Sequence, residues 1–209
     1  NGRLGAMIFG GVGQERIQLN EDSLWSGAPQ DADNPKALEV LPQIRQLLFA
    51  GKYEEAQRLA NRNLICRGPG SGRGRGGKIA YGSYEMLGDL TLFFPYVKPG
   101  DVTDYRRELD VANAISRVSY SVGGVKFERE LFVSAPDQVL VVRLTASKKG
   151  ALNFIANLTR PEAAEVLPVG QNQLLLRGQL WNGQAYEGMK YAARLKAVVE
   201  GGSVSSSTN

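Results

Sequence analysis

The sequence contains no histidine and only one cysteine, Cys66, in 209 residues. Without histidine, the chain lacks a Ser-His-Asp triad, histidine zinc ligands and imidazole acid–base catalysis. The lone cysteine excludes an intrachain disulfide framework. Any catalysis within these residues would therefore use carboxylates, hydroxyls, Lys, Tyr or Cys66, and we expect no metal site and no cofactor.

Long apolar runs are also missing. No run approaches the roughly 18 residues that a membrane-spanning helix requires, so we expect no membrane partner. With 43% hydrophobic and 22% charged residues, the composition is that of an ordinary soluble chain. Its length suffices for one well-buried core or at most two small ones.

A basic surface that extends over the whole chain is not indicated, although the formal net charge is +4. Four basic residues within the glycine-rich stretch 67–78 equal the whole excess: Arg67, Arg73, Arg75 and Lys78. Low-complexity sequence of this kind cannot build a core, so a surface loop is the favoured interpretation. The alternative is an arginine–glycine segment that binds nucleic acid; we predict no nucleic-acid partner.

What the sequence does contain is a β pattern punctuated by glycine turns. Residues 115–122 and 125–133 alternate apolar and polar side chains around Gly123 and Gly124, which is a strong hairpin signal. Residues 105–109 lead into this hairpin. Further strands are expected at 4–9, 16–19, 90–94, 139–144, 152–158, 174–176 and 189–199. Strands at this spacing predict a mainly β fold, an antiparallel β-sandwich.

A helical pair interrupts this pattern at about residues 34–64. Apolar residues recur there at three- and four-residue spacing in both halves of the segment. We expect Pro42 to divide the first half into a short turn and a main helix over 42–50, followed by a second helix over 53–64. Amphipathic helices usually bury one face, so the inserted pair is predicted to cover a sheet or a neighbouring domain.

The stretch 10–27 concentrates polar and aromatic side chains at the end of a predicted strand. Asn20, Glu21 and Asp22 follow the last apolar position of that strand, and Trp25 comes three residues later. Two carboxylates, an amide and an indole are the groups that a sugar-binding rim would use. The alternative interpretation is a tight Asx-type turn anchored by a buried Trp25.

Hydrolysis of a glycoside usually requires two carboxyl groups that act on one bond. Glu21 and Asp22 are neighbours in sequence, and neighbours in an extended segment point to opposite sides. Glu85 and Asp89 form a second pair, but Asp89 follows a glycine and is expected to shape a turn. Neither pair is predicted to be catalytic.

A third pair of carboxylates, Glu128 and Glu130, shares one face of the hairpin strand. Lys126 and Arg129 flank this pair in the sequence. Alternating charges of this kind are typical of a solvated hairpin surface. This pair is therefore not predicted to be catalytic either.

Five segments form an ordered set of motifs that spans most of the chain. They are Asn1–Gly11 continued by Ile17–Gly27, Leu41–Arg45, Leu87–Leu90, Tyr105–Asp110 and Ala135–Val139. The second part of the first segment reads Ile17-Gln18-Leu19-Asn20-Glu21-Asp22-Ser23-Leu24-Trp25-Ser26-Gly27. This set resembles the start of the family-95 glycoside hydrolases, which are mostly bacterial α-L-fucosidases with some α-L-galactosidases.

The resemblance implies that residues 1–209 are an N-terminal β-sandwich of the supersandwich-like type. In that family a helical linker, an (α/α)6 barrel and a C-terminal β domain follow. The general acid and the water-activating residue of an inverting mechanism lie in the barrel, and the resemblance therefore implies that this chain is non-catalytic. It also implies two partners, the catalytic barrel of the same polypeptide and a fucosylated glycan.

The resemblance further implies a bacterial protein of the periplasm or the extracellular space, although no signal peptide is visible in the chain. It also implies that the domain continues with more strands after residue 209. Strand edges exposed at such a boundary could pair between chains. We therefore list a homo-oligomer among the expected states.

Six residues are the candidates for a substrate rim or a domain interface: Asn20, Glu21, Asp22, Trp25, Arg106 and Trp181. For Arg106 the alternative is surface ion pairing with Glu108 and Asp110. Trp181 is predicted to be a loop aromatic on which a sugar could stack. An independent carbohydrate-binding module that uses Trp25 and Trp181 is the alternative function.

Overall fold

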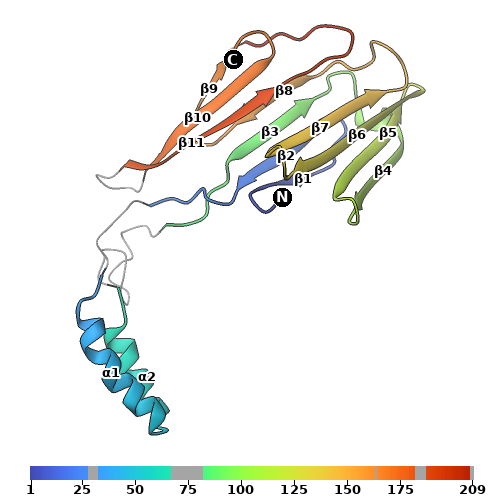
Figure 1. Cartoon of the computed structure of the whole chain (residues 1–209). Helices are drawn as coiled ribbons and strands as arrows, with labels where there is room; N and C mark the ends of the chain where they lie inside the picture. The colour runs from blue at the N-terminus through green and yellow to red at the C-terminus, as the bar shows by residue number, and fades with distance from the viewer. Residues whose placement is uncertain (28–32, 67–81, 163, 182–186, 208–209) are drawn as a thin grey trace. The chain divides into compact units, whose positions relative to one another are not determined.

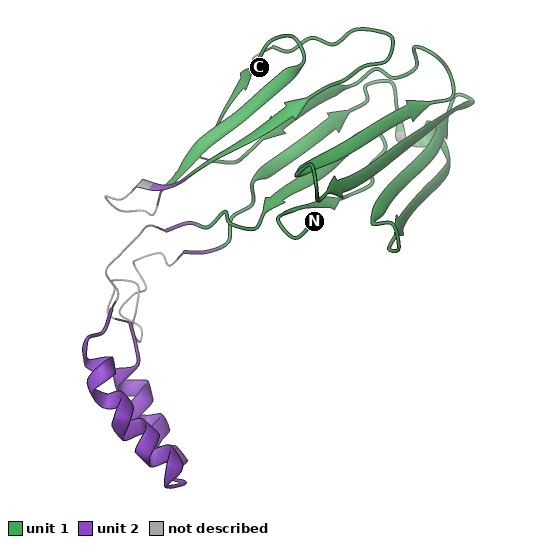
Figure 2. Cartoon of the chain, viewed as in Figure 1, with its two compact units in different colours: residues 1–25, 84–180, 190–209 green, residues 26–83, 181–189 purple. Residues whose placement is uncertain are grey.

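The computed structural model describes residues 1–27, 33–66, 82–162, 164–181 and 187–207 (Figure 1). The chain divides into two compact units, which are coloured separately in Figure 2. The first comprises residues 1–25, 84–180 and 190–209, and the second comprises residues 26–83 and 181–189. The predicted glycine–arginine loop at 67–78 lies outside the described residues.

The strands form three sheets in the described part of the chain. One has the order β1-β2-β3-β8, with β1 (Leu4–Ile8), β2 (Gln14–Glu21), β3 (Gly88–Phe93) and β8 (Ile155–Thr159). The second has the order β4-β5-β6-β7, with β4 (Val102–Asp110), β5 (Ile115–Val122), β6 (Val125–Ser134) and β7 (Val139–Ala146). The third has the order β11-β10-β9, with β9 (Ala164–Pro168), β10 (Gln173–Trp181) and β11 (Glu187–Lys196). A short 3₁₀ turn, Pro99–Asp101, precedes β4.

Buried apolar side chains from all three sheets form one core cluster. On β5 the buried Val118 and Tyr120 alternate with partly exposed serines, as the pleat of a half-buried strand requires. The same core cluster includes Ile17, Leu90, Leu92 and Leu158 of the first sheet, Phe127 and Leu131 of β6, and Leu176 of β10. Burying one such side chain contributes about 1.5–3 kcal/mol. The predicted antiparallel β-sandwich is confirmed.

The predicted β5–β6 hairpin is also confirmed. Gly123 and Gly124 have φ angles of 56° and 75°, which suits a two-residue turn whose twist matches the strands. The register pairs Val122 with Val125 and Tyr120 with Phe127. The rings of Tyr120 and Phe127 stack with their centroids 5.4 Å apart.

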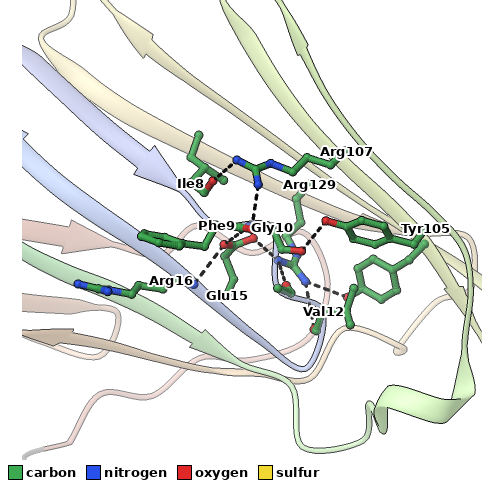
Figure 3. Close-up of polar contacts among 11 residues, drawn as sticks. Ile8, Phe9, Gly10, Val12, Glu15, Arg16, Tyr105, Arg107 and Arg129 are labelled. Carbon is green, nitrogen blue, oxygen red and sulfur yellow. Dashed lines mark hydrogen bonds and ion pairs between the residues drawn. The ribbon is translucent and has the colours of Figure 1, made fainter.

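A buried ion pair joins the first two sheets (Figure 3). Arg129 of β6 is 1% exposed, and its Nη1 lies 2.6 Å from Oε2 of Glu15 on β2, which is fully buried. Arg129 also donates to the carbonyls of Gly11 at 2.6 Å and Val12 at 3.1 Å. The pair therefore fixes the β1–β2 turn against the second sheet.

The remaining polar groups of this pair are nearly all satisfied. Oε1 of Glu15 accepts hydrogen bonds from the backbone N–H groups of Gly10 and Arg16. The guanidinium of Arg129 lies over the rings of Phe94 and Tyr120, at 4.8 and 5.3 Å from their centroids. The prediction that Arg129 flanks a solvated surface is therefore wrong. Glu128 and Glu130 occupy the opposite face of β6, where Glu130 pairs with arginines.

A second group of side chains holds the same turn from β4 (Figure 3). Tyr105 donates its hydroxyl to the carbonyl of Gly10 at 2.9 Å. Arg107 donates to the carbonyls of Phe9 at 3.1 Å and Ile8 at 2.6 Å. Two strands of the second sheet thus bind one glycine turn of the first.

The second unit contains the predicted helical pair, α1 (Lys36–Phe49) and α2 (Tyr53–Asn63). The expected division at Pro42 is wrong, because α1 continues through this residue. Pro42 lies on the exposed side of the helix, and the carbonyl of Leu38, which loses its helical partner, can bond water there. The side-chain amide of Asn34 connects the helices by donating to the carbonyls of Asn63 and Ile65.

Three further differences concern strands. Asp89 does not shape a turn; it lies within β3, opposite Gln18 of β2. Strand β9 (Ala164–Pro168) was not expected from the sequence, because its short apolar run Val166–Leu167 lies next to a proline. The strand expected to begin at Leu152 begins at Ile155 instead.

The crowding around the β1–β2 turn predicts a large effect of Gly10→Ala. Gly10 has φ +77°, and an added Cβ would lie 2.8 Å from both Arg107 Cδ and Tyr105 Oη. Gly124 is a matched control, because its φ is +75° and a Cβ there has no neighbour within 4 Å. The left-handed backbone costs an alanine about 1–2 kcal/mol at both positions. Displacing Tyr105 or Arg107 adds a second cost at Gly10 alone.

We therefore expect Gly10→Ala to lower the free energy of unfolding by at least about 1 kcal/mol more than Gly124→Ala does. Urea denaturation of the two variants and the parent chain measures this difference. Equal losses would show that Tyr105 and Arg107 do not constrain the turn.

Candidate functional site

The predicted rim follows the end of β2. Asn20 and Glu21 are the last residues of the strand, and residues 22–24 turn away from it. The chain then forms an isolated antiparallel bridge between Trp25 and Tyr84. Leu24, which is buried in the core, anchors this turn, whereas Trp25 is 48% exposed. A turn is therefore present, but the alternative in which a buried Trp25 anchors it is wrong.

The rim holds Trp25 in a defined orientation. Its indole Nε1 donates to the carbonyl of Asp22 at 3.0 Å. The ring meets Tyr84 edge to face, with centroids 5.9 Å apart and planes at 76°. The hydroxyl of Tyr84 donates to Oδ1 of Asn20 at 3.1 Å. Three of the predicted residues, Asn20, Asp22 and Trp25, thus lie in one connected group with Tyr84, which sequence reasoning missed.

Glu21 serves the turn as a structural carboxylate. It accepts hydrogen bonds from the hydroxyl and the backbone N–H of Ser23, at 2.7 and 2.9 Å. Arg3 Nε lies 2.9 Å from its other oxygen. The hydroxyl of Ser23 lowers the pKa of Glu21 most, with further lowering by Arg3, against the opposite effect of partial burial. A lowered pKa disfavours the protonated form that a general acid needs.

The charges of the rim act on Tyr84. Burial raises the pKa of its phenol, and the nearby carboxylates of Glu21 and Asp22 raise it further. The hydroxyl therefore stays protonated and can donate to Asn20. Among the described residues, no side chain or backbone group donates a hydrogen bond to the carboxylate of Asp22, which is exposed. Asp22 and the face of Trp25 are the rim groups open to a ligand.

Arg106 does not belong to this rim. It lies on β4 opposite Ser119, and its Nη2 is 2.5 Å from Oε2 of Glu108. The predicted alternative of surface ion pairing is thus confirmed for Glu108. The other expected partner, Asp110, pairs with Arg117 instead, at 3.6 Å.

Trp181 is the last residue of β10 and is exposed, so it ends a strand instead of lying in a loop. It belongs to the second unit, whereas Trp25 belongs to the first. Residues 182–186, which follow Trp181, lie outside the described residues. Each tryptophan is therefore described within its own unit.

The carboxylates of the second candidate pair, Glu85 and Asp89, are each bound by an arginine. Glu85 lies 3.4 Å from Nη2 of Arg160, whose guanidinium is nearly buried over the ring of Tyr191. Asp89 lies 3.0 Å from Nη2 of Arg16. Because each carboxylate forms an ion pair with an arginine, neither Glu85 nor Asp89 is placed to activate water or to protonate a leaving group.

Glu15 is the buried carboxylate that sequence reasoning missed. The alternation of side chains along β2 could have indicated its burial, because Glu15 lies on the same face of the strand as Ile17 and Leu19. Ile17 and Glu15 are both fully buried. In the ranges that the structure describes, no group of three or more acidic, Cys or His residues could hold a metal ion. None of the described helices is long and apolar enough to cross a membrane.

The sandwich, its helical insert and the motif-bearing turn agree with a comparison against protein families. All of residues 1–209 match the family described as "Glycosyl hydrolase family 65, N-terminal domain". The chain therefore belongs to this family of N-terminal domains.

Three relatives are similar to the chain. "Alpha-L-fucosidase 2" of Arabidopsis thaliana is 40% identical over 181 residues, which cover 85% of this chain and 20% of the relative. "Probable alpha-fucosidase A" of Aspergillus niger is 34% identical, and its counterpart in Aspergillus oryzae is 28% identical. Each of the fungal matches covers 97% of this chain and 24% of the relative.

The chain thus spans about a fifth to a quarter of the length of these relatives. The predicted resemblance to the N-terminal domain of an α-L-fucosidase is confirmed by the family and by the relatives together. The finer assignment to family 95 stays a prediction.

The lowered pKa of Glu21 predicts a pH-dependent contribution to stability. The folded-state pKa lies below the usual value of 4.5, so the ionised carboxylate stabilises the fold above that pH. This stabilisation is lost as the pH falls through the lowered folded-state pKa. Glu21→Gln removes the titrating group, and Ser23→Ala removes the hydrogen bond that lowers the pKa most.

We expect the stability difference between the parent chain and Glu21→Gln to shrink as the pH falls below about 4.5. The same stability difference, measured for Glu21→Gln in a Ser23→Ala background, should change less with pH. Chemical denaturation between about pH 3 and 7 measures both differences. A difference that stays constant over this range would contradict the assigned role of Glu21.

Proposed function

We propose that this chain is the non-catalytic N-terminal β-sandwich of an inverting α-L-fucosidase of family 95. The whole protein would hydrolyse terminal fucose from glycans. The printed names of the three relatives support the substrate class. The observation that supports the non-catalytic role most directly is that Glu21, Glu85 and Asp89 are each bound by an arginine or by turn hydrogen bonds.

An inverting glycosidase needs two carboxyl groups roughly 6.5–9.5 Å apart, one of them protonated at the working pH. In this chain Glu21 is held ionised by Ser23 and Arg3. The pKa of Asp110 is lowered too, chiefly by hydrogen bonds from Asn113. The buried Glu15 is bound by Arg129 and by two backbone N–H groups. These environments favour structural carboxylates over a general acid.

The catalytic partner in this proposal is an (α/α)6 barrel of the same polypeptide. The coverage of a fifth to a quarter of each relative supports a long remainder that could contain it. The domain would pack on this barrel and border its mouth. A bacterial origin and a periplasmic or secreted location stay predictions, and the relatives named above come from a plant and two fungi.

In this role the rim would contact the part of the glycan that extends from the scissile bond. The open face of Trp25 suits the apolar face of a sugar ring, and the exposed carboxylate of Asp22 suits its hydroxyl groups. The edge-to-face contact with Tyr84 fixes the indole before a ligand arrives. The rim would therefore affect binding of an oligosaccharide more than the chemical step.

A comparison of activities tests the proposal. The longer gene product should release fucose from a fucosylated oligosaccharide, whereas residues 1–209 alone should release none. Within the longer protein, Glu21→Gln and Asp22→Asn should leave kcat within a few-fold of the parent. Fucose release by the short chain, or loss of kcat by a thousand-fold in either variant, would contradict the non-catalytic role.

A second candidate function is an independent carbohydrate-binding module. The exposure of both Trp25 and Trp181 favours it. It predicts that residues 1–209 bind a fucosylated oligosaccharide with a change in tryptophan fluorescence, and that Trp25→Ala or Trp181→Ala reduces this change. If the fluorescence of residues 1–209 did not change with added oligosaccharide, the independent module would be excluded. Sugar binding by the rim would then require the catalytic part of the longer protein.

A further inference from the structure

The α1–α2 hairpin has very little apolar core of its own. Across both helices only Ile44 and Ala56 are buried among the described residues. The groove between the helices is lined mainly by polar and charged side chains, among them Gln43, Glu55 and Arg58. Isolated helices of this length are marginal in water without tertiary packing. The hairpin therefore requires a further surface to pack against.

The hairpin also presents large apolar side chains to solvent. Phe49 at the end of α1 is 90% exposed, and Leu38 on the same helix is 77% exposed. These two residues are eleven positions apart, about three helical turns, and therefore lie on one side of α1. Leu48 and Tyr53 add exposed surface beside Phe49, at 45% and 68%. We refer to Leu38, Leu48, Phe49 and Tyr53 as the apolar stripe.

We propose that the apolar stripe is the surface by which this domain docks on the catalytic remainder of the same polypeptide. This inference rests on the proposed function, since it requires the longer protein. The stripe would insert into an apolar depression on that remainder, with Phe49 as its most deeply buried side chain. Aromatic anchors of this kind contribute most of the binding energy of an interface.

The charges of the hairpin leave only a small positive excess. Lys52 lies 3.6 Å from Glu55, and Arg58 lies 3.8 Å from Glu54. Residues 36–63 carry five basic and three acidic side chains in all. An anionic membrane or a nucleic acid is bound by denser basic clusters, of about 4–8 Lys or Arg at a membrane, so the charges favour an apolar partner.

The size of the stripe argues for a partner in the same chain. Its four side chains expose on the order of 500 Å², since a large side chain presents about 150–250 Å². A stable complex between separate chains buries about 800 Å² per partner. A partner on the same polypeptide is present at an effective concentration in the mM range, at which a smaller contact suffices. A dimer through the stripe alone is therefore disfavoured.

Photo-crosslinking in the longer gene product tests the inference. Phe49 is replaced by p-benzoylphenylalanine, which keeps an aromatic ring at this position, and the crosslinked peptides are identified by mass spectrometry. We expect crosslinks to peptides beyond residue 209 in the same molecule. Val111 is a matched control, because it is 82% exposed but lies in the turn after β4. The same replacement at Val111 should give at least five-fold fewer such crosslinks.

Three results would overturn the inference: crosslinks only within residues 1–209, crosslinks between two copies, or the same yield at Phe49 and Val111. The replacement at Tyr53 provides a second position in case the first lowers the yield of folded protein. Fucosidase activity of the same preparations separates the two proposals. Active protein without the expected crosslinks contradicts the docking surface alone, whereas an inactive parent gene product contradicts the proposed function.

Discussion

The contact between Glu15 and Arg129 is the interaction on which the first unit depends. Both side chains are buried, and removing two charges from water costs several kcal/mol per ion, which their attraction offsets only when further hydrogen bonds satisfy the remaining polar atoms. Here Glu15 binds two backbone N–H groups as well as Arg129, and Arg129 binds two carbonyls as well as Glu15. Nε of Arg129 is the atom of this pair that finds no hydrogen-bond partner among the described residues. The pair therefore specifies one arrangement of the β1–β2 turn against β6 and excludes others.

This arrangement also places the rim. Glu15 and Asn20 belong to one strand, and a slip of one residue would turn every side chain of β2 to the opposite face. A slip would leave the buried Arg129 without its carboxylate, expose Ile17, and place Arg16, which pairs with Asp89, in the core. The register of β2 is thus fixed at one end, and the positions of Asn20 and Trp25 at the other end follow from it. Glu15, Glu21 and Asp89 act as structural carboxylates, which supports the proposed non-catalytic role.

The elements that were predictable from the sequence are those with strong local signals. The glycine pair at 123–124 between alternating strands indicated the β5–β6 hairpin, and the apolar spacing indicated both helices. Other features depended on distant residues. Arg129 resembles a surface arginine in its local sequence, and only a carboxylate more than a hundred positions away makes its burial favourable. Pro42 normally ends a helix, yet the solvent-facing side of α1 tolerates it.

The rim was located from its residue types, but its geometry was not predictable. Trp25 was expected either to face a ligand or to be buried as an anchor, and the neighbouring Leu24 takes the buried position instead. Tyr84 lies about sixty residues away in sequence, beyond the helical insert, so no local pattern pointed to its contact with Trp25. Arg106 and Trp181 were chosen by residue type alone; Arg106 pairs with Glu108 on β4, and Trp181 ends β10 in the second unit.

The most direct test of the central role of the buried pair is a double-mutant cycle with Glu15→Gln and Arg129→Met, read by chemical denaturation of residues 1–209. Each single variant leaves one buried group without its partner and should cost roughly 3–5 kcal/mol. The double variant should cost less than the sum, with a coupling energy of about 2 kcal/mol or more. A coupling energy below about 0.5 kcal/mol would mean that the two side chains act independently. The sheets would then be held together by apolar packing and by the hydrogen bonds from Tyr105 and Arg107.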